Sequence, residues 1–341
     1  MIILITLAAF ATALTLAFLL SRPAFRWQWL DHPNERSLHQ HPVPRTGGLA
    51  VLGSGLTSSV LLTLLVPATH PLLITLPLGL LPLAIISWLD DRQGMAMGWR
   101  FLVHFWAAIS LIEVNPVPNL LDLPSLPWQL PIGVIHILSM LFVVWMINLY
   151  NFMDGMDGFA GGMAVIGFSA LAWLGRVDTG FTAICLSVAA ASAGFLVCNF
   201  PPARIFLGDI GSTTFGFLAA ACSLWGARME LFPLWVSLLV FSPFIMDATV
   251  TLIRRLLRGE KVWQAHRSHY YQRLVLLGWG HRRTVLVEYG LMLACAGSAL
   301  LAVHLPPVGQ ITLVVIWVLI YGLLMRGVCW LEQRCLSAAC Q

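Results

Sequence analysis

Charged residues are scarce in this chain of 341 residues, at 10%, whereas apolar residues make up 59%. A water-soluble domain carries about 25% charged residues, so this chain has too few to cover a globular surface. It also lacks a polar stretch long enough for a second domain. The longest, 254–284, is shorter than the roughly 40 residues at which a domain begins to fold unaided. We therefore expect one integral membrane domain over residues 1–341.

The seven cysteines include no Cys-x-x-Cys pair, which argues against the common zinc and dithiol motifs. Most of them lie in apolar segments, where cysteine packs as a small hydrophobic residue. We expect no disulfide framework and no zinc site. There is also no internal repeat of fixed period, and we expect no nucleic-acid partner.

Long apolar segments recur along the chain, and its mean hydropathy is +0.84. A bilayer core needs roughly 20 apolar residues per helix. The segments of suitable length are 2–21, 47–66, 71–89, 99–114, 131–150, 159–175, 181–199, 212–227, 232–253, 285–304 and 309–328. Because 99–114 and 212–227 are short, the predicted fold class is all-α, a polytopic membrane helix bundle of 10–11 transmembrane helices.

Basic residues are distributed unevenly between the predicted loops. If the N-terminus lies outside and the spans alternate, all nineteen Lys and Arg residues except Arg176 and Arg228 fall on the inner side. This is the positive-inside bias of membrane proteins. The first span has basic residues after it and none before it, the reverse of a signal peptide. We expect it to be an uncleaved helix, and the outer segment 115–131, with its five prolines, to form a stiff loop.

Two adjacent carboxylates, Asp90 and Asp91, follow the third apolar segment. Such a pair repels itself unless a cation or a proton lies between the two groups. A solvated pair at a helix end is one explanation. The other is a magnesium or phosphate site, because Mg²⁺ prefers carboxylate oxygens combined with substrate phosphates.

A second polar cluster ends the fifth segment, and Gly155 and Gly158 lie within it. Its amide and acidic members are Asn148, Asn151, Asp154 and Asp157. The first three follow helical spacing and converge on one side. The glycines allow the backbone to turn or to approach a ligand closely. Polar groups at the end of an apolar span are costly unless paired or bound, so we favour a ligand site over a simple helix-ending turn.

A third cluster, from Phe206 to Ser212, precedes the eighth segment and contains Gly208, Asp209 and Gly211. Glycines with Asp and Ser at a helix start expose backbone N–H groups, where a phosphate can bind. An ordinary N-cap formed by Ser212 is the alternative.

A basic inner loop separates the ninth and tenth segments and carries Arg267, His269 and Arg273. Orientation in the membrane explains its positive charge. It does not explain the crowding of His, Tyr and Trp residues, so we favour diphosphate binding. Asp247, inside the ninth segment, could pair with Arg254 and Arg255 or orient another group. His104, His136 and His304 are expected to pack between helices or to lie at the membrane interface.

Carboxylates at three inner helix ends, glycine turns and one basic loop together predict a Mg²⁺–diphosphate site, with Mn²⁺ as a substitute metal. In this order, the motifs resemble those of the polyprenyl-phosphate N-acetylhexosamine-1-phosphate transferase family. The resemblance extends from Asp31 and the Pro44-Arg-Thr-Gly-Gly segment to the loop that ends near Arg283. Its closest likeness is to members that initiate O-antigen synthesis.

The resemblance implies a role for each matching residue. Asp209 corresponds to the magnesium-binding aspartate, and Asp90 and Asp91 to the essential carboxylate pair near the acceptor phosphate. Asn151, Asp154 and Asp157 correspond to residues that line the nucleotide-sugar site. Phe206 lies where an aromatic ring stacks on uracil, and Asn199 where an amide lines the same cavity. With Asn148, Arg267, His269 and Arg273, these form the predicted substrate site.

The sequence departs from the family pattern in one place. Many relatives carry a histidine-rich motif in the last large cytoplasmic loop. Here His269 matches its first histidine, and Tyr271 replaces a later one.

The resemblance implies transfer of N-acetylhexosamine-1-phosphate from a UDP-sugar to undecaprenyl phosphate or another polyprenyl phosphate, with release of UMP. This would be the first membrane step of lipopolysaccharide O-antigen or related cell-envelope glycan synthesis. We expect a bacterial inner membrane enzyme, surrounded by lipid, with its site facing the cytoplasm and a homodimer as one possible state. The alternatives are a phospho-N-acetylmuramoyl-pentapeptide transferase, an intramembrane prenyltransferase and a transporter. The donor sugar, the identity of the base and a one-step or covalent mechanism remain open.

Overall fold

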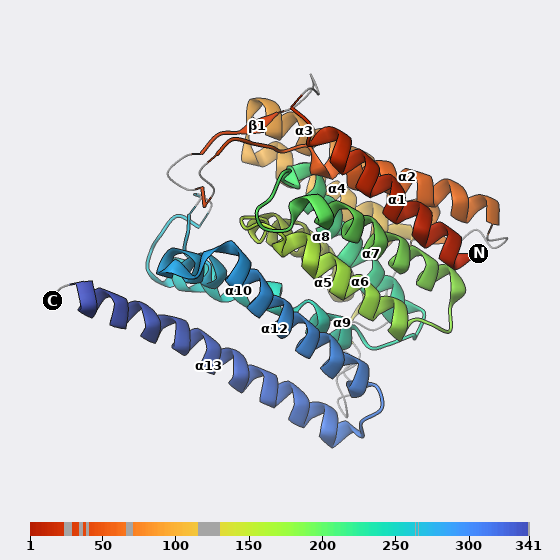
Figure 1. Ribbon diagram of the computed structural model, residues 1–341. Coiled ribbons are helices and arrows are strands. Elements are labelled where there is room, and N and C mark those ends of the chain that lie inside the picture. Colours follow the sequence, from red (N-terminus) through yellow and green to blue (C-terminus); the bar gives the residue numbers. More distant parts are fainter. Residues whose placement is uncertain are drawn as a thin grey trace.

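The computed structural model describes residues 1–23, 29–33, 37–38, 41–65, 71–114, 130–262, 264 and 266–339. The predicted outer loop 115–131 therefore lies almost wholly outside the described residues. The described part is a bundle of helices that run back and forth along a common direction (Figure 1).

The helices follow the apolar segments of the sequence. They are α1 (Ile2–Leu20), α2 (Gly47–Leu65), α3 (Pro71–Gln93), α4 (Met97–Val114), α5 (Ile132–Phe152), α6 (Phe159–Leu174), α7 (Thr179–Asn199), α8 (Gly208–Arg228), α9 (Leu234–Val240), α10 (Ser242–Leu257), α11 (Tyr270–Leu274), the π-helical turn η1 (Val275–Trp279), α12 (Gly280–Ala302) and α13 (Pro307–Ala339). Two short strands, β1 (Leu30–Asp31) and β2 (Val43–Pro44), pair antiparallel.

Each predicted membrane segment falls on one helix, or on a bent pair in the case of 232–253. Among the described residues, seven helices are long and apolar enough to cross a membrane, and the pair α9–α10 would make an eighth. Two further apolar helices, at Met97–Ile112 and Phe159–Leu174, are shorter. The all-α polytopic membrane class is confirmed.

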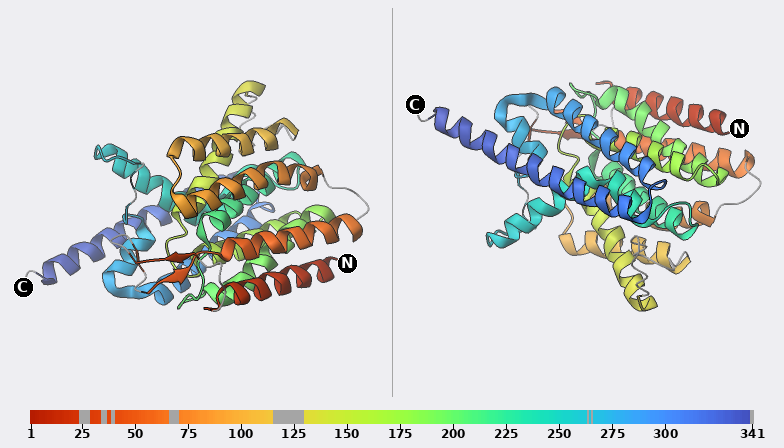
Figure 2. Two further views of the ribbon diagram at one scale, coloured as in Figure 1. Left: turned by 90° about the horizontal axis from the view of Figure 1, so that it is seen from above. Right: turned by 90° about the horizontal axis from the view of Figure 1, so that it is seen from below.

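Helix α8 forms the centre of the bundle, and nearly all of its residues are buried. It lies very close to α5, because a Cβ added to Gly216 would lie 2.4 Å from the carbonyl oxygen of Met146. Helix α13 lies at the edge of the bundle, where Figure 2 shows it crossing the other helices. Most of its apolar side chains, such as Leu319 and Leu323, are exposed. Apolar side chains on the outside are expected where lipid replaces water.

The ninth predicted span is not straight. Helices α9 and α10 meet at an angle of 81°, with the break at Phe241 and Ser242. Pro243 follows the break, where its missing N–H and its ring prevent a continuous helix. The bend directs α10 away from the course of α9.

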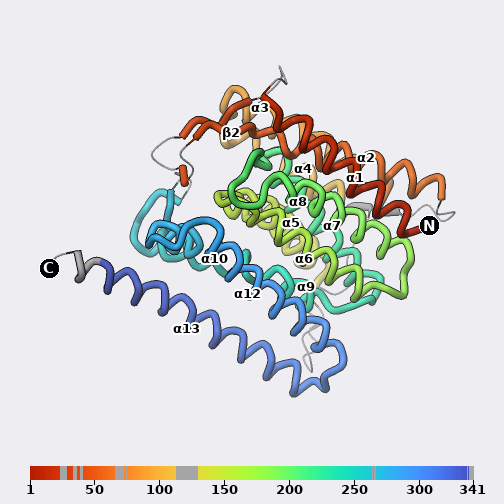
Figure 3. The backbone as a smooth tube through the Cα atoms, in the orientation of Figure 1, coloured from red at the N-terminus to blue at the C-terminus, as the bar shows by residue number. Residues whose placement is uncertain are grey.

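The ends of α3, α5 and α7 and the starts of α2, α6 and α8 lie at one end of the bundle, opposite the N-terminus (Figure 3). The strands β1 and β2 lie at the same end, with Leu30 opposite Pro44 and Asp31 opposite Val43. All three acidic motifs of the sequence are therefore brought to one end.

Candidate active site

A short backbone contact joins the third motif to the segment before α2. The N–H of Phe206 donates to the carbonyl of Pro44 at 2.7 Å. In return, Gly47 and Gly48 donate to the carbonyls of Phe206 and Leu207 at 2.9 and 2.7 Å. These bonds satisfy N–H groups at the start of α2, which has no earlier helical turn to supply acceptors. They also fix the glycine turn beside Arg45.

Glycine is required at two positions of this contact. Gly208 has a φ of +72°, and a Cβ there would lie 2.8 Å from the carbonyl oxygen of Arg45. A Cβ on Gly48 would lie 2.4 Å from the backbone nitrogen of Gly211. Because glycine has no side chain, α2 and α8 can approach this closely. The alternative reading of the third motif, in which Ser212 caps the helix, is wrong, since α8 begins one turn earlier, at Gly208.

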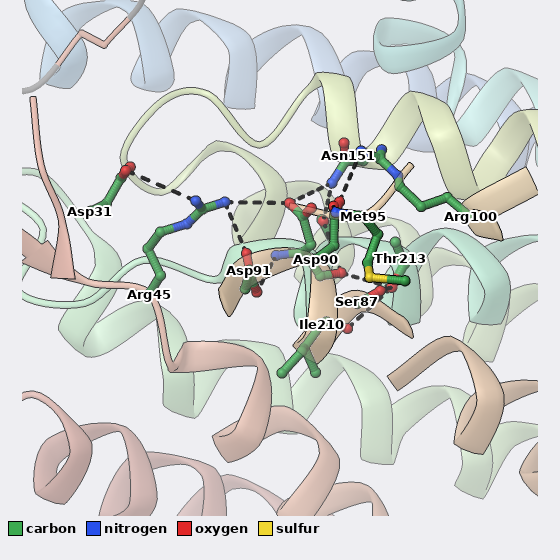
Figure 4. Close-up of polar contacts among 12 residues, drawn as sticks. Asp31, Arg45, Ser87, Asp90, Asp91, Met95, Arg100, Asn151, Ile210 and Thr213 are labelled. Carbon is green, nitrogen blue, oxygen red and sulfur yellow. Dashed lines mark hydrogen bonds and ion pairs between the residues drawn. The ribbon is translucent and has the colours of Figure 1, made fainter. Parts of the chain in front are cut away.

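Arg45 lies among three carboxylates (Figure 4). Its Nη2 is 3.0 Å from Asp91 Oδ1 and 3.4 Å from Asp209 Oδ1, and its Nη1 is 3.9 Å from Asp31 Oδ1. The backbone N–H of Asp209 also donates to Asp91 Oδ2 at 3.2 Å. The first and third motifs are thus joined directly, through both a guanidinium group and a backbone amide.

Asn151 brings the second motif into the same cluster. Its side-chain amide donates to Asp209 Oδ1 at 2.9 Å and to Ser212 Oγ at 3.1 Å. Asn151 therefore holds the carboxylate of Asp209 in one orientation.

Asp90 and Asp91 are adjacent but have different partners. Asp90 accepts a hydrogen bond from the backbone N–H of Met95 at 2.6 Å and pairs with Arg100 Nη1 at 2.9 Å. Asp90 therefore ties the end of α3 to α4, whereas Asp91 faces Arg45 (Figure 4) and accepts from the backbone N–H of Asp209.

The cluster holds more negative than positive charge. Burial, followed by the nearby Asp209 carboxylate, raises the pKa of Asp91 to about 7. Asp91 lies just beyond the predicted span 71–89. The same two causes raise the pKa of Asp154, in the turn after α5, well above its usual range. The positive charge of Arg45 lowers the pKa of both carboxyl groups, but both values stay above the usual range of an aspartic acid. Such crowding favours a bound cation, which would stabilise the ionised carboxylates.

A cavity of about 260 Å³ opens beside this cluster. Its walls include Asp154, Asp157, Asn199 and Phe206 from the predicted substrate site, together with Asp31, Arg45, Gly208, His266, Gln272 and His281. Carboxylates, a guanidinium group and an aromatic ring thus line one space. This combination suits a ligand with both phosphates and a flat ring.

Two of the predicted site residues shape the wall through backbone contacts. Asp157 accepts from the N–H of Ala203 at 3.0 Å and lies 3.0 Å from His281 Nδ1. Asn199 accepts from the N–H of Gly158 at 3.0 Å and donates to the carbonyl of Ile205 at 2.9 Å. Both side chains hold the loop before Phe206 against the start of α6.

Asn148 lies one helical turn deeper than Asn151 and does not line the cavity. Its side-chain nitrogen is 3.1 Å from His104 Nδ1 and donates to the carbonyl of Val144. Both side chains are buried. In the structure, Asn148 joins α4 to α5, and His104 packs between helices as expected.

His269 is buried behind the cavity. Its Nδ1 lies 3.2 Å from Asp247 Oδ1, and the backbone N–H groups of Tyr270 and Tyr271 donate to the same carboxyl group at 2.9 and 3.0 Å. Asp247 therefore orients the start of α11, and no contact with Arg254 or Arg255 is found among the described residues. The hydroxyl of Tyr271 donates to the carbonyl of Phe152 at 3.1 Å.

Arg267 and Arg273 do not line the cavity with the carboxylates. Arg273 pairs with Glu332 of α13. Both arginines line a separate cavity between α10, α11 and α13. From the same loop, His266 and Gln272 line the carboxylate cavity instead.

Sequence reasoning gave no individual role to Arg45, His281 or Gln272, although the last two belong to the basic loop for which diphosphate binding was favoured. Arg45 carried a signal, because a cation two residues before a pair of glycines at a helix start is a typical phosphate-binding arrangement. The other two carried no comparable pattern.

No group of three or more His, Cys, Asp and Glu side chains in the described part of the chain is arranged to hold a metal ion by itself. Mg²⁺ is usually bound by one or two carboxylates plus substrate phosphates rather than by a complete protein cage. The carboxylates of Asp91 and Asp209, which both lie beside Arg45, are groups of the kind that such a site uses.

Comparison with known proteins points to the same three acidic motifs. The family model described as glycosyl transferase family 4 matches residues 73–227, which contain all three acidic motifs. A probable undecaprenyl-phosphate N-acetylglucosaminyl 1-phosphate transferase of Bacillus subtilis is 29% identical, over 84% of this chain and 81% of the relative.

Two other relatives have related activities. An undecaprenyl-phosphate alpha-N-acetylglucosaminyl 1-phosphate transferase of Yersinia pestis is 26% identical, over 94% of this chain and 89% of its own. A phospho-N-acetylmuramoyl-pentapeptide-transferase of Staphylococcus saprophyticus is 25% identical, over 72% and 80%.

The fold and the site define a polytopic helical membrane protein with a cavity lined by carboxylates at one end of the bundle. The matching family model and the relatives support the polyprenyl-phosphate N-acetylhexosamine-1-phosphate transferase family as the group that this chain resembles.

Proposed function

We propose that this protein transfers N-acetylhexosamine-1-phosphate from a UDP-sugar to a polyprenyl phosphate, with undecaprenyl phosphate as the acceptor, and releases UMP. The observation that carries the proposal is the convergence of Asp91, Asp209 and Arg45 beside a cavity that also holds Phe206. An acceptor phosphate oxygen attacks the β-phosphorus of the donor. The bond from this phosphorus to the α-phosphate oxygen breaks, and UMP leaves with that oxygen.

The residues present fit a magnesium ion. Asp209, with Asp91 or Asp154, would hold it, together with phosphate oxygens of the substrates. A bound Mg²⁺ would offset negative charge on the diphosphate, the usual dominant effect in phosphoryl transfer. The raised pKa values of Asp91 and Asp154 support a cation at this place.

The protein's own groups supply orientation and further charge. Arg45 offers a planar guanidinium group that can bind phosphate oxygens in a fork. Asn151 keeps the Asp209 carboxylate aligned. Asp91 lies where it can face the acceptor phosphate, while Asp90 fixes the end of α3 through Arg100 and Met95.

We further propose that the site faces the cytoplasm of a bacterial inner membrane. The basic residues around the candidate site, including Arg45, Arg100 and Arg267, support this orientation through the positive-inside rule. The product would begin an O-antigen or a related cell-envelope glycan. The acidic groups lie at helix ends rather than at mid-membrane, which disfavours a transporter.

The test is a reconstituted assay. Purified protein would be mixed with undecaprenyl phosphate and Mg²⁺, and UMP release would be measured for each of several UDP-sugars. We expect turnover with at least one UDP-N-acetylhexosamine and none without the acceptor. UDP-N-acetylmuramoyl-pentapeptide as the only active donor would assign the peptidoglycan reaction. No UMP release from any donor would refute the proposal.

Phe206 is expected to stack on the uracil of the donor. Stacking of a base on an aromatic ring contributes roughly 1–3 kcal/mol by alanine substitution. Phe206→Ala should therefore raise the donor KM about 5- to 150-fold, with a much smaller change in the acceptor KM. Phe206→Tyr keeps the ring and should stay within a few fold of wild type. Steady-state kinetics would measure both, and an unchanged donor KM in Phe206→Ala would show that the ring only packs.

A further inference from the structure

A second polar cavity, of about 390 Å³, lies between α10, the segment before α11, η1 and α13. Five arginines line it, and only Glu260 and Glu332 oppose them. The arginines are Arg254, Arg255, Arg258, Arg267 and Arg273. A cavity with this excess of positive charge is expected to bind an anion.

Three of the five guanidinium groups already have partners. Arg255 pairs with Glu260 at 2.7 Å, Arg273 pairs with Glu332, and Arg254 donates to the hydroxyl of Tyr270 at 2.8 Å. These contacts hold three of the arginine side chains in place on the wall of the cavity. In the part of the chain that the structure describes, the side chains of Arg258 and Arg267 make no hydrogen bond and no ion pair. The charge available to a ligand is therefore concentrated on these two arginines.

Exposed apolar side chains flank the cavity. Leu256 and Leu257, the last two residues of α10 before Arg258, are 65% and 81% exposed, and Leu276 on the cavity wall is 54% exposed. Figure 2 shows α10 leaving the body of the bundle after its bend. A helix with arginines and exposed leucines, at the end of a membrane span, is typical of a segment at the membrane surface.

This cavity is distinct from the candidate active site, because the two share no lining residue. The short helix α11 separates them. Gln272 lines the carboxylate cavity, and its neighbour Arg273 lines the arginine cavity. His269 and Asp247 are buried behind the start of α11.

We propose that the arginine cavity binds the phosphate of an anionic phospholipid headgroup, with the acyl chains beside Leu256 and Leu257. Two unpaired guanidinium groups match phosphate oxygens, which they bind in a fork. The flanking leucines can contact acyl chains, whereas they would add nothing to the affinity for a free phosphate or a nucleotide. Anionic lipids also concentrate at the cytoplasmic membrane surface, where basic residues are attracted to them.

Direct binding to the full-length protein in detergent tests this proposal without turnover. The probe is radiolabelled dioctanoyl phosphatidylglycerol, with dioctanoyl phosphatidylcholine as the neutral counterpart. An arginine near lipid phosphates typically contributes a factor of about five in affinity. The double variant Arg258→Gln with Arg267→Gln should therefore bind phosphatidylglycerol about 25-fold more weakly. Arg326→Gln, on the exposed part of α13 away from the cavity, should bind like wild type.

Competition identifies the source of the phosphate. Excess unlabelled phosphatidylglycerol should displace the probe, whereas inorganic phosphate, UDP-N-acetylglucosamine and a short-chain polyprenyl phosphate should not. Displacement by any of these three would assign the cavity to a free anion or to a substrate and overturn the proposal. Equal binding of phosphatidylcholine would also overturn it, as would equal affinity of the double variant. If the double variant does not fold, Arg258→Gln alone should weaken binding about fivefold.

Discussion

Asp209→Asn should reduce UMP release by at least 10²–10³-fold, the typical cost of losing one strong electrostatic stabiliser at a reacting centre. Asp209 lies at the meeting point of the three motifs, with Asn151 at 2.9 Å, Arg45 at 3.4 Å and its own N–H bound to Asp91. The amide removes a negative charge and one strong metal ligand while it conserves volume. Activity and Mn²⁺ binding, followed by electron paramagnetic resonance, should fall together.

Asp178→Asn is a matched control for this substitution. Asp178 caps the start of α7 at the other end of the bundle, where its Oδ1 accepts from the N–H of Phe181, a role that an amide oxygen can also fill. It should leave both turnover and Mn²⁺ binding unchanged. In the wild-type protein, excess chelator should abolish UMP release, and added Mg²⁺ should restore it. Full turnover with chelator, or normal Mn²⁺ binding by Asp209→Asn, would contradict the metal assignment.

The helices of this protein could be predicted from sequence because length and apolar composition alone determine a membrane span. The bend between α9 and α10 was missed, since hydropathy is continuous through 232–253. A signal was nevertheless present in Pro243, which cannot continue the hydrogen bonding of α9. Similarly, the start of α8 was placed too late because Gly208 and Asp209 suggested a turn.

The acidic part of the site could also be predicted, because Asp91, Asn151 and Asp209 lie at helix ends on one side of the membrane. Their contacts with Arg45 could not be predicted, because they depend on the close approach of Gly48 and Gly211. The two arginines of the loop, Arg267 and Arg273, were predicted to converge with the carboxylates.

The structure places Arg267 and Arg273 in the arginine cavity instead, for a simple geometric reason. Neighbouring residues on a helix point about 100° apart, so Gln272 and Arg273 face different cavities. A loop composition rich in arginine predicts anion binding but not the cavity in which it occurs. The orientation of α11 decides this, and it rests on Asp247, whose carboxyl group accepts from the N–H groups of Tyr270 and Tyr271.

Asp91→Asn should lower kcat by about 10²–10⁴-fold, the range expected for loss of a group that acts on a proton or on charge in the transition state. Asp91 contacts Arg45 at 3.0 Å and the N–H of Asp209 at 3.2 Å, so its charge lies within the reacting cluster. The donor KM should change little, because the carboxylate is assigned to the acceptor side. Asp90→Asn should have a smaller effect on kcat. Its remaining oxygen can still accept from Met95, and only the pairing with Arg100 is weakened.

The two adjacent substitutions control for each other, since both exchange an acid for an amide at the end of α3. Steady-state kinetics with varied donor and varied acceptor would separate kcat from each KM, and thermal unfolding in detergent would verify that both variants fold. Arg100→Gln should reproduce the effect of Asp90→Asn, because it breaks the same contact between α3 and α4. If Asp90→Asn lowered kcat as much as Asp91→Asn while Arg100→Gln had no effect, Asp90 would act on the substrates directly. In that case the division of roles proposed here would be wrong.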